Sequence, residues 1–353
     1  MAKKYETVYN DLREQINRGE FRAEDKLPSE TELVDRYAVS RQTVRQALKL
    51  LEKDGSICKV RGSGTFVQEV LPRIETKCVA VITYDIAASV FPAVLSRIEQ
   101  TLFSSGYATM LFSTCGSPQK ERQILEQLCA NPVNGIILHA TESMLNSLNI
   151  DLILKLQGMG TRFVFMDNRY PDEALRHIPS VTMDDYQGAH QITSELIASG
   201  CRNLGGIFSC MASQLLSRFL GVRRAVVDAG IVYDRHDFLL CGDNDEERVK
   251  EQIASVGGQR LFEKESVLCG SGAYAAHLCD VICLRGRGAI RTLVSFDDAD
   301  LPAIEGIRFI KLKHAGREIG DACARKILHL IQGGEESDES FPWRTEEGKR
   351  YPS

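Results

Sequence analysis

The sequence lacks the features of a membrane or secreted protein. None of its 353 residues belongs to an apolar run of about 18 residues or more, which a spanning helix requires. The segment Met1–Glu6 is followed by no apolar core, so we expect no signal peptide. These absences favour a protein that works in the cytoplasm.

Metal-binding patterns are also missing. The eleven cysteines stand singly, and the pairs Cys201/Cys210 and Cys279/Cys283 do not have the spacing of a zinc site. An odd number of cysteines without a targeting signal fits a reducing compartment. We therefore expect buried thiols that act as small apolar side chains, and no bound metal.

Catalytic motifs are absent as well. Gly286-Arg287-Gly288 lacks the third glycine and the strand–helix context of a dinucleotide site. Neither a Walker A motif nor a G-x-S-x-G elbow occurs, and the seven histidines form no H-E-x-x-H pattern. We expect no enzyme and no cofactor, and a cytoplasmic sugar enzyme stays only as a remote alternative.

The charge is unevenly distributed. The net charge of −5 argues against a nucleic-acid partner if it is taken alone. Within residues 40–66, however, only Glu52 and Asp54 oppose the basic side chains of Arg41, Arg45, Lys49, Lys53, Lys59 and Arg61. A basic stretch of this kind is the expected footprint of a DNA-binding segment.

The first seventy residues predict three helices. Tyr5, Val8, Tyr9, Leu12 and Ile16 recur at helical spacing, and Gly19 ends that pattern. Ser29 and Glu32 form an S-x-x-E capping box before a short helix that buries Leu33, Val34 and Tyr37. After a turn at Ala38-Val39, Ser40 caps a third helix with the apolar face Val44, Ala47, Leu48 and Leu51.

The third helix exposes polar and basic groups at its start. Two short helices joined by a tight turn, with such a second helix, are typical of a helix-turn-helix. Residues 57–67 then place two β-rich runs around Gly62-Ser63-Gly64, which predicts a hairpin. A glycine-rich tip beside Arg61 can enter a DNA groove closely.

Three motifs in this order resemble the GntR-family winged helix over residues 5–67. They are residues 27–30 (Leu-Pro-Ser-Glu), 39–48 (Val-Ser-Arg-Gln-Thr-Val-Arg-Gln-Ala-Leu) and 61–67 (Arg-Gly-Ser-Gly-Thr-Phe-Val). Thr31 departs from the pattern, because many members place an arginine there. The resemblance implies double-stranded operator DNA as a partner. The implied DNA contacts are Ser29, Glu30, Ser40, Arg41, Gln42, Thr43, Arg45, Arg61, Gly62, Ser63 and Gly64.

The remainder predicts an α/β fold. The polar, proline-marked residues 71–77 form a linker. Apolar strands alternate with helical patterns after it, which favours parallel sheets covered by helices, and the length favours two lobes. We expect strands at 78–83, 107–112, 135–139, 162–166, 204–208, 265–269 and 291–294, and helices beginning near Phe91, Gln119, Ser147, Tyr186, Ser213, Asp245, Ala273 and Gly316.

Residues 78–332 resemble the LacI/GalR regulator domain, which is similar to periplasmic sugar-binding proteins. The resemblance rests on the order of short motifs at residues 81–84, 91–92, 134–137, 165–167, 181–188, 217–221, 295–301 and 313–320. A GntR-type head on such a body is the arrangement of the AraR-type arabinose repressors. It implies a homodimeric repressor of carbohydrate-utilisation genes that an arabinose-like or other small sugar releases from DNA.

Planar polar groups can form hydrogen bonds with the vicinal hydroxyls of a sugar, and an aromatic ring can pack against its apolar face. By family position we expect an effector site made by Tyr84, Asp167, Arg218, Ser271 and Asp297. Tyr84 could equally serve packing, whereas Asp184 and Asp298 fit turn caps better than ligand contacts. His314 is expected to pack or to contact the other lobe.

Residues 269–273 (Cys-Gly-Ser-Gly-Ala) stand where the family usually has an Asn-Asp pair. The effector could therefore differ, or the pocket could no longer sense a sugar, which leaves a DNA-binding regulator without effector response as the alternative. The predicted domains are a head at 1–70, a linker at 71–77, an effector and dimerisation domain at 78–335, and a loosely ordered polar tail at 336–353.

Overall fold

The computed structural model describes residues 4–18, 20–22, 24–53, 55–60, 63–67, 77–87, 90–242, 246–297 and 299–345. Its contacts divide the chain into two compact units, Met1–Thr76 and Lys77–Ser353. All of the predicted linker except Lys77 lies outside the described residues.

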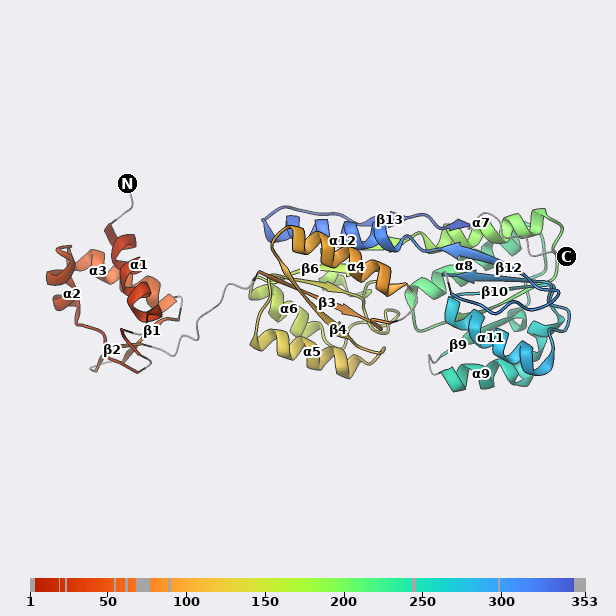
Figure 1. The fold of residues 1–353 in the computed structure, drawn as a ribbon, viewed down its shortest axis with the longest axis horizontal. Helices are drawn as coiled ribbons and strands as arrows, with labels where there is room; N and C mark the ends of the chain where they lie inside the picture. The colour runs from red at the N-terminus through yellow and green to blue at the C-terminus, as the bar shows by residue number, and fades with distance from the viewer. Residues whose placement is uncertain are drawn as a thin grey trace. The chain divides into compact units, whose positions relative to one another are not determined.

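The first unit is a three-helix head with a hairpin (Figure 1). Its elements are α1 (Lys4–Asn17), α2 (Glu30–Tyr37), α3 (Arg41–Lys53), β1 (Ile57–Val60) and β2 (Gly64–Val67). The predicted capping box is present, because Ser29 Oγ accepts from Glu32 N and the Glu32 carboxylate accepts from Ser29 N. The predicted face of α3 is buried together with Val8, Leu12 and Leu33.

The hairpin is antiparallel, with Ile57 opposite Val67 and Val60 opposite Gly64. Lys26 bridges to Phe66 and ties the hairpin to the segment before α2. The predicted contact residues Arg61 and Gly62 lie outside the described residues, so the hairpin is defined here by its two strands.

The second unit contains two six-stranded sheets, one in each lobe (Figure 1). The first lobe has the strand order β13-β7-β6-β5-β3-β4, and every pairing in it is parallel. Helices α4 and α12 cover one face of this sheet and α5 and α6 the other. The bounds are β3 (Cys78–Thr83), α4 (Phe91–Ser104), β4 (Ala108–Ser113), α5 (Pro118–Ala130), β5 (Gly135–Leu138), α6 (Ile150–Gly158), β6 (Arg162–Met166), η1 (Glu173–Leu175), β7 (Ser180–Met183), α12 (Gly316–Ile331) and β13 (Glu339–Phe341).

The second lobe has the order β14-β12-β11-β10-β8-β9, in which only β14 runs antiparallel to its neighbour. Helices α7 and α8 cover one face, and α9 and α11 cover the other (Figure 1). The bounds are α7 (Asp185–Ala198), β8 (Leu204–Ser209), α8 (Ser213–Asp228), η2 (Arg235–Asp237), β9 (Phe238–Cys241), α9 (Glu246–Ala254), α10 (Val256–Gln259), η3 (Arg260–Glu263), β10 (Ser266–Cys269), α11 (Gly272–Arg285), β11 (Thr292–Phe296), β12 (Arg308–Lys313) and β14 (Arg344–Thr345).

The chain passes between the two lobes three times. It crosses from β7 to α7, returns from β12 to α12, and crosses again from β13 to β14. One apolar cluster reaches across both sheets and includes Val79, Phe208, Phe296 and Trp343. The lobes therefore share part of their core beside the crossings.

The structure extends the expected strand set and corrects the expected tail. Each predicted strand has a counterpart, but β7, β9, β12, β13 and β14 were not predicted. The interpretation of residues 336–345 as a loosely ordered tail is wrong, because β13 pairs with β7 and β14 pairs with β12. Residues 346–353 lie outside the described part, as does Asp245, and α9 begins at Glu246.

Candidate functional site

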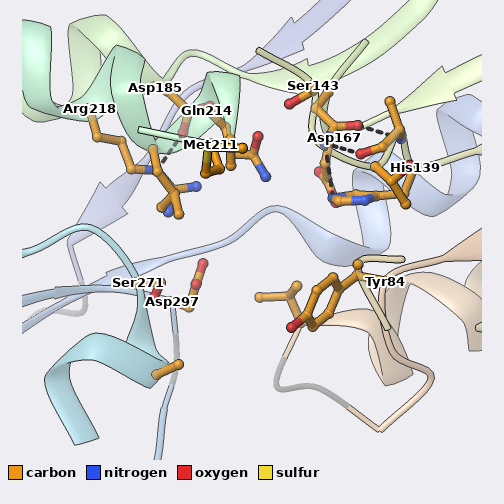
Figure 2. A pocket seen from close by; sticks show the side chains of 18 of the residues that line it. Tyr84, His139, Ser143, Asp167, Asp185, Met211, Gln214, Arg218, Ser271 and Asp297 are labelled. Carbon is orange, nitrogen blue, oxygen red and sulfur yellow. Dashed lines mark hydrogen bonds and ion pairs between the residues drawn. The ribbon is translucent and has the colours of Figure 1, made fainter. Parts of the chain in front are cut away.

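A polar cavity of about 580 Å³ lies between the lobes of the second unit (Figure 2). Its walls come from the carboxyl ends of strands in both sheets, where α/β folds place their ligands. Tyr84 follows β3, His139 follows β5, Asp167 follows β6 and Asp297 follows β11. The volume lies in the range of small-molecule sites.

Arg218 is the buried cation of this cavity, with 5% of its surface exposed. It lies in the second turn of α8, the helix that the sequence predicts to begin near Ser213. Its Nε donates to Asp185 Oδ1 at 2.8 Å, and its Nη1 donates to the carbonyl of Gly270. Burial alone would lower the pKa of Arg218, but the carboxylates of Asp185 and Asp297 outweigh it and raise that pKa.

Aromatic rings hold the guanidinium of Arg218 on its other sides. Its Cζ lies 4.7 Å from the centroid of Trp343 and 5.0 Å from that of Phe296. Trp343 Nε1 donates to Asp185 Oδ1, the oxygen that also accepts from Arg218 Nε. Arg218 has more N–H donors than these protein contacts use, and it lines the cavity.

Asp167 and His314 form a second buried pair, between the end of β6 and the segment after β12. His314 Nε2 lies 3.2 Å from Asp167 Oδ1. Burial would lower the pKa of His314, but the Asp167 carboxylate outweighs it and raises the pKa. The pKa of Asp167 is lowered, because the charge of His314 overcomes the effect of burial. The expectation that His314 contacts the other lobe is confirmed.

The backbone at two of the carboxylates is strained. Asp167 has φ +62° and Asp297 has φ +83°, a region that residues other than glycine seldom occupy. Such conformations persist where the surrounding structure enforces them, and they cluster at ligand sites. Both carboxylates line the cavity.

Three buried polar atoms of cavity-lining residues have no hydrogen-bond partner among the described residues: His139 Nδ1, Gln214 Oε1 and His314 Nδ1. Burial lowers the pKa of His139, so its imidazole is neutral near pH 7. Unpaired buried polar groups are costly, and a hydroxyl-rich ligand would pair them.

The cavity is closed at one point by a serine pair. Ser143, in the loop after β5, accepts a hydrogen bond from Ser213 N at 2.9 Å and shares a hydroxyl contact of 2.9 Å with it. Ala212, the N-cap of α8, supplies no side-chain cap, so Ser143 caps α8 from the other lobe. The two serines therefore join the lobes directly at this point.

A buried carboxylate supports the floor of the cavity. Glu121 is completely buried, and its oxygens accept from Tyr170, Asn149 and the hydroxyl of Thr141. Burial and the Glu121 charge raise the pKa of Tyr170 far above its usual range. Thr141 lines the cavity, so this network fixes a loop of the site.

The five expected effector residues all line this cavity (Figure 2). Ser271 also caps α11, because its Oγ accepts from Tyr274 N. Asp184 caps α7, as expected, by accepting from Gln187 N, whereas Asp298 lies outside the described residues. Sequence reasoning missed several lining residues that carry polar groups: His139, Ser143, Asp185, Gln214, Tyr274 and His277.

The head gathers its own set of expected residues around the start of α3. Ser40 caps α3 by accepting from Thr43 N, and Arg41 and Gln42 are exposed. Arg45 Nε pairs with Glu30 at 2.8 Å, and Arg41 Nη2 donates to Thr31. The Arg45 side chain is 64% exposed, so this ion pair holds it weakly and leaves it available. On the hairpin, Gly64 has φ +129° and faces Lys26 closely, and Ser63 precedes it.

No described helix is long and apolar enough to span a bilayer. All eleven cysteines lie among the described residues and are free thiols. No metal-binding cluster of His, Cys, Asp and Glu occurs within the described ranges.

Comparison with known families divides the chain into the same two parts as the structure, a head and a second unit. Residues 4–67 match the model of bacterial regulatory proteins of the gntR family. Residues 76–291 match the model of periplasmic binding proteins and the sugar binding domain of the LacI family.

Relatives align over most of the chain. It is 29% identical to the arabinose metabolism transcriptional repressor of Geobacillus stearothermophilus, over 93% of this chain and 91% of that protein. It is 27% identical to the repressor of the same name from Halalkalibacterium halodurans, over 94% and 90% of the two chains.

Among solved structures, a periplasmic binding protein/LacI transcriptional regulator from Alkaliphilus metalliredigens, complexed with D-xylulofuranose, matches with a TM-score of 0.64. It is 17% identical and covers 77% of this chain and 97% of its own, which supports the fold of the second unit. The chain therefore belongs to the family of periplasmic binding proteins and LacI sugar-binding domains, with a GntR-type helix-turn-helix head fused in front of that domain.

Proposed function

We propose that this chain is a DNA-binding transcriptional repressor of carbohydrate-utilisation genes, which a small sugar releases from its operator. One observation carries the proposal: a GntR-type head and a LacI-type domain with a polar cavity stand in one chain. Two relatives aligned over nine-tenths of the chain are named arabinose metabolism transcriptional repressors. We place the protein in the cytoplasm, where its free thiols stay reduced.

The start of α3 is the surface that reads DNA in this proposal. Its first turn enters the major groove, where Arg41 and Arg45 reach base edges or phosphates and the free backbone N–H groups donate hydrogen bonds to a phosphate. Gln42, Thr43, Ser40, Ser29 and Glu30 border this turn, and the hairpin tip at residues 61–64 follows the neighbouring groove. Releasing Arg45 from Glu30 costs little, because exposed ion pairs contribute about 1 kcal/mol or less.

Operator titrations test this surface. We expect R41A and R45A each to weaken operator binding by about 1–3 kcal/mol if they read bases, and to relax specificity at one position. A phosphate contact would instead weaken all sequences alike and reduce the salt dependence. K53A, at the far end of the same helix, is the matched control for lost charge. Unchanged affinity in both arginine variants would contradict the docking.

The cavity is the proposed sugar site. Arg218, Asp167 and Asp297 supply planar hydrogen-bonding groups, Tyr84 supplies a ring, and Ser271 supplies a hydroxyl beside them. An arabinose-like sugar is the first ligand to test, because of the names of the two aligned relatives. A ligand at one hundred times its Kd stabilises the fold by about 2.7 kcal/mol. Thermal unfolding with both arabinose enantiomers, xylose, ribose, galactose and cellobiose measures this directly.

The variant D297N separates ligand contact from structure, because asparagine tolerates the positive φ of Asp297. We expect D297N to lose the sugar-dependent stabilisation, whereas D300N, at an exposed position three residues after the buried Asp297, retains it. An equal response in both variants would place the sugar elsewhere.

A homodimer completes the proposal, since one head presents too few base-reading side chains for tight selective binding. Strand β4 is at the edge of the first sheet. Met110 and Leu111 of β4 and Phe103 of the neighbouring helix α4 are exposed apolar side chains. A second copy would cover them and set two heads on a near-palindromic site. Sedimentation should show a dimer that M110E weakens, and a monomeric wild type would refute this assembly.

Sugar and operator DNA then weaken each other's binding, although they occupy different sites. Coupling of this kind is typically about 1–3 kcal/mol, or roughly 5–150-fold in affinity. Linkage requires operator DNA to weaken sugar binding by the same factor. Titrating each ligand in the presence of the other measures both sides, and unequal factors would exclude simple linkage.

A further inference from the structure

We propose that Trp343 is a positioning residue of the sugar site, which fixes the Arg218 guanidinium without touching the ligand. The inference rests on the proposed function and concerns the segment between β13 and β14, which the sequence analysis assigned to a polar tail. Trp343 is the sole tryptophan of the chain and is 8% exposed.

The contacts of Trp343 converge on the buried ion pair. Its ring lies against Arg218, with 4.7 Å from Cζ to the ring centroid, and its Nε1 donates to Asp185 Oδ1 at 3.1 Å. That oxygen also accepts from Arg218 Nε, so one tryptophan restrains both partners of the pair. Trp343 is not among the residues that line the cavity, whereas Arg218 and Asp185 are.

The surroundings leave Trp343 little freedom. Its ring meets Phe296 edge-on at 5.1 Å and His314 at 5.6 Å between centroids. A Cβ added at Gly188 would lie 2.5 Å from its Cδ1, so the helix α7 approaches the indole as closely as glycine allows. The ring is thus wedged between α7 and β11, and β14, which begins at the next residue, pairs with β12.

An arginine without this support would have several rotamers to lose when a ligand binds. Immobilising such a side chain at a binding site costs about 0.5–1.5 kcal/mol, which corresponds to roughly two- to thirteenfold in affinity. We therefore expect W343A to bind sugar roughly two- to thirteenfold more weakly than the wild type. W343F retains a ring over Arg218 and should stay closer to the wild type.

The first experiment needs no ligand. Because Trp343 is the sole tryptophan, the emission spectrum of the full-length protein reports its environment. Replacing Arg218 with methionine keeps a long side chain but removes the charge over the ring. At a pH where far-UV circular dichroism shows R218M to be folded, we expect it to shift the Trp343 emission maximum, whereas R224M, on the same helix but paired with Asp228, leaves it unchanged. An unchanged spectrum in R218M would overturn the proposed contact.

The second experiment measures affinity by calorimetry, with the sugar of the panel above that stabilises the wild type most. F341A is the matched control, because Phe341 is also an aromatic residue of the C-terminal segment and packs against the same core, but it lies in β13 and pairs with Met183 of the first lobe. W343A and F341A should both lower the melting temperature, and only W343A should weaken sugar binding. Equal affinities in W343A and the wild type, or an equal loss in F341A, would overturn the positioning role.

The two experiments separate the two proposals. If no sugar of the panel stabilises the wild type, the proposed effector class is wrong, and the emission of R218M still decides whether Trp343 holds Arg218.

Discussion

Removing the charge of Arg218 should destabilise the second unit strongly, because Asp185 would remain buried without its counter-ion. The two side chains are 6% and 7% exposed, and their N–O distance is 2.8 Å. Breaking a buried pair by removing one partner typically costs about 3–5 kcal/mol, since the remaining charge loses its compensation. We expect R218M to lose about that much, although the Trp343 indole still donates to Asp185 Oδ1.

The companion variant removes both charges. R218M/D185N leaves an amide that can still accept from Trp343, and replacing both members of a buried pair by neutral groups is often close to neutral in stability. We expect the double variant to recover most of what R218M loses. The difference between the two variants isolates the cost of the uncompensated carboxylate.

The loss in R218M should depend on pH in a defined direction. Burial already raises the pKa of Asp185 in the presence of Arg218, and removing Arg218 raises it further. A carboxyl whose folded pKa lies above its unfolded value favours folding at low pH, and it loses that contribution as the pH rises through the folded pKa. The stability of R218M should therefore be closest to that of the wild type at about pH 4 and should become lower than that of the wild type toward neutral pH.

Urea unfolding followed by far-UV circular dichroism, at several pH values, measures these differences. Full-length protein is suitable, because the sole tryptophan, Trp343, belongs to the second unit and its emission can be compared with the circular dichroism of the whole chain. The reasoning fails if R218M and R218M/D185N lose equal stability, or if the deficit of R218M shrinks as the pH rises. This result also bears on sensing: a lost sugar response in an Arg218 variant counts as a binding defect only if the second unit is still folded.

Three further outcomes are expected. H314Q should reduce the loss of stability above about pH 7, which urea unfolding at pH 6 to 9 would detect. The pKa of His314 is raised, so the contribution of its protonated form to stability is complete at low pH and is lost as the pH rises. A parallel decline in stability of both proteins would contradict this. S29A should cost the head about 1 kcal/mol through the lost cap of α2, whereas S63A, outside any helix, should cost nothing measurable by thermal unfolding of the head. G116A should destabilise the second unit by about 1 kcal/mol or more, since the φ of Gly116 is +73°. It should also weaken sugar binding, because the new Cβ would lie 2.8 Å from the Tyr84 ring. The control G106A has a similar φ, but its new Cβ would meet no atom within 4 Å, so it should affect stability alone.

The sequence predicted the head well because its signals are local. Capping by Ser29 and Ser40 and the apolar face of α3 depend on residues three or four positions apart. The same holds for the strands of the second unit that form continuous apolar runs. Strands β7, β9 and β12 were missed because they are short or mix exposed positions with buried ones.

The site was predicted only where family position supplied it. Asp167, Arg218 and Asp297, which family position predicts as effector residues, line the same cavity, but their partners come from distant parts of the chain. Asp185 lies 33 residues from Arg218 and Trp343 lies 158 from Asp185, so no local pattern connects them. The polar composition of residues 335–340 hid β13, which begins at Glu339 within that stretch, because a three-residue strand carries almost no periodic signal.

The late return of the chain to the first lobe, where β13 pairs with β7, has a consequence for synthesis. A ribosome releases the chain from its first residue at about 5–20 residues per second, so the strands of the first lobe emerge long before residues 339–341. Until those residues emerge, the edge of β7 lacks the neighbour that it has in the finished sheet, and an unpaired edge can capture a strand from another chain. The first lobe can therefore complete its sheet only after strands β8 to β12 of the second lobe have been made. A nascent chain stalled between residues 183 and 339 carries an open β edge that can pair with another chain and aggregate.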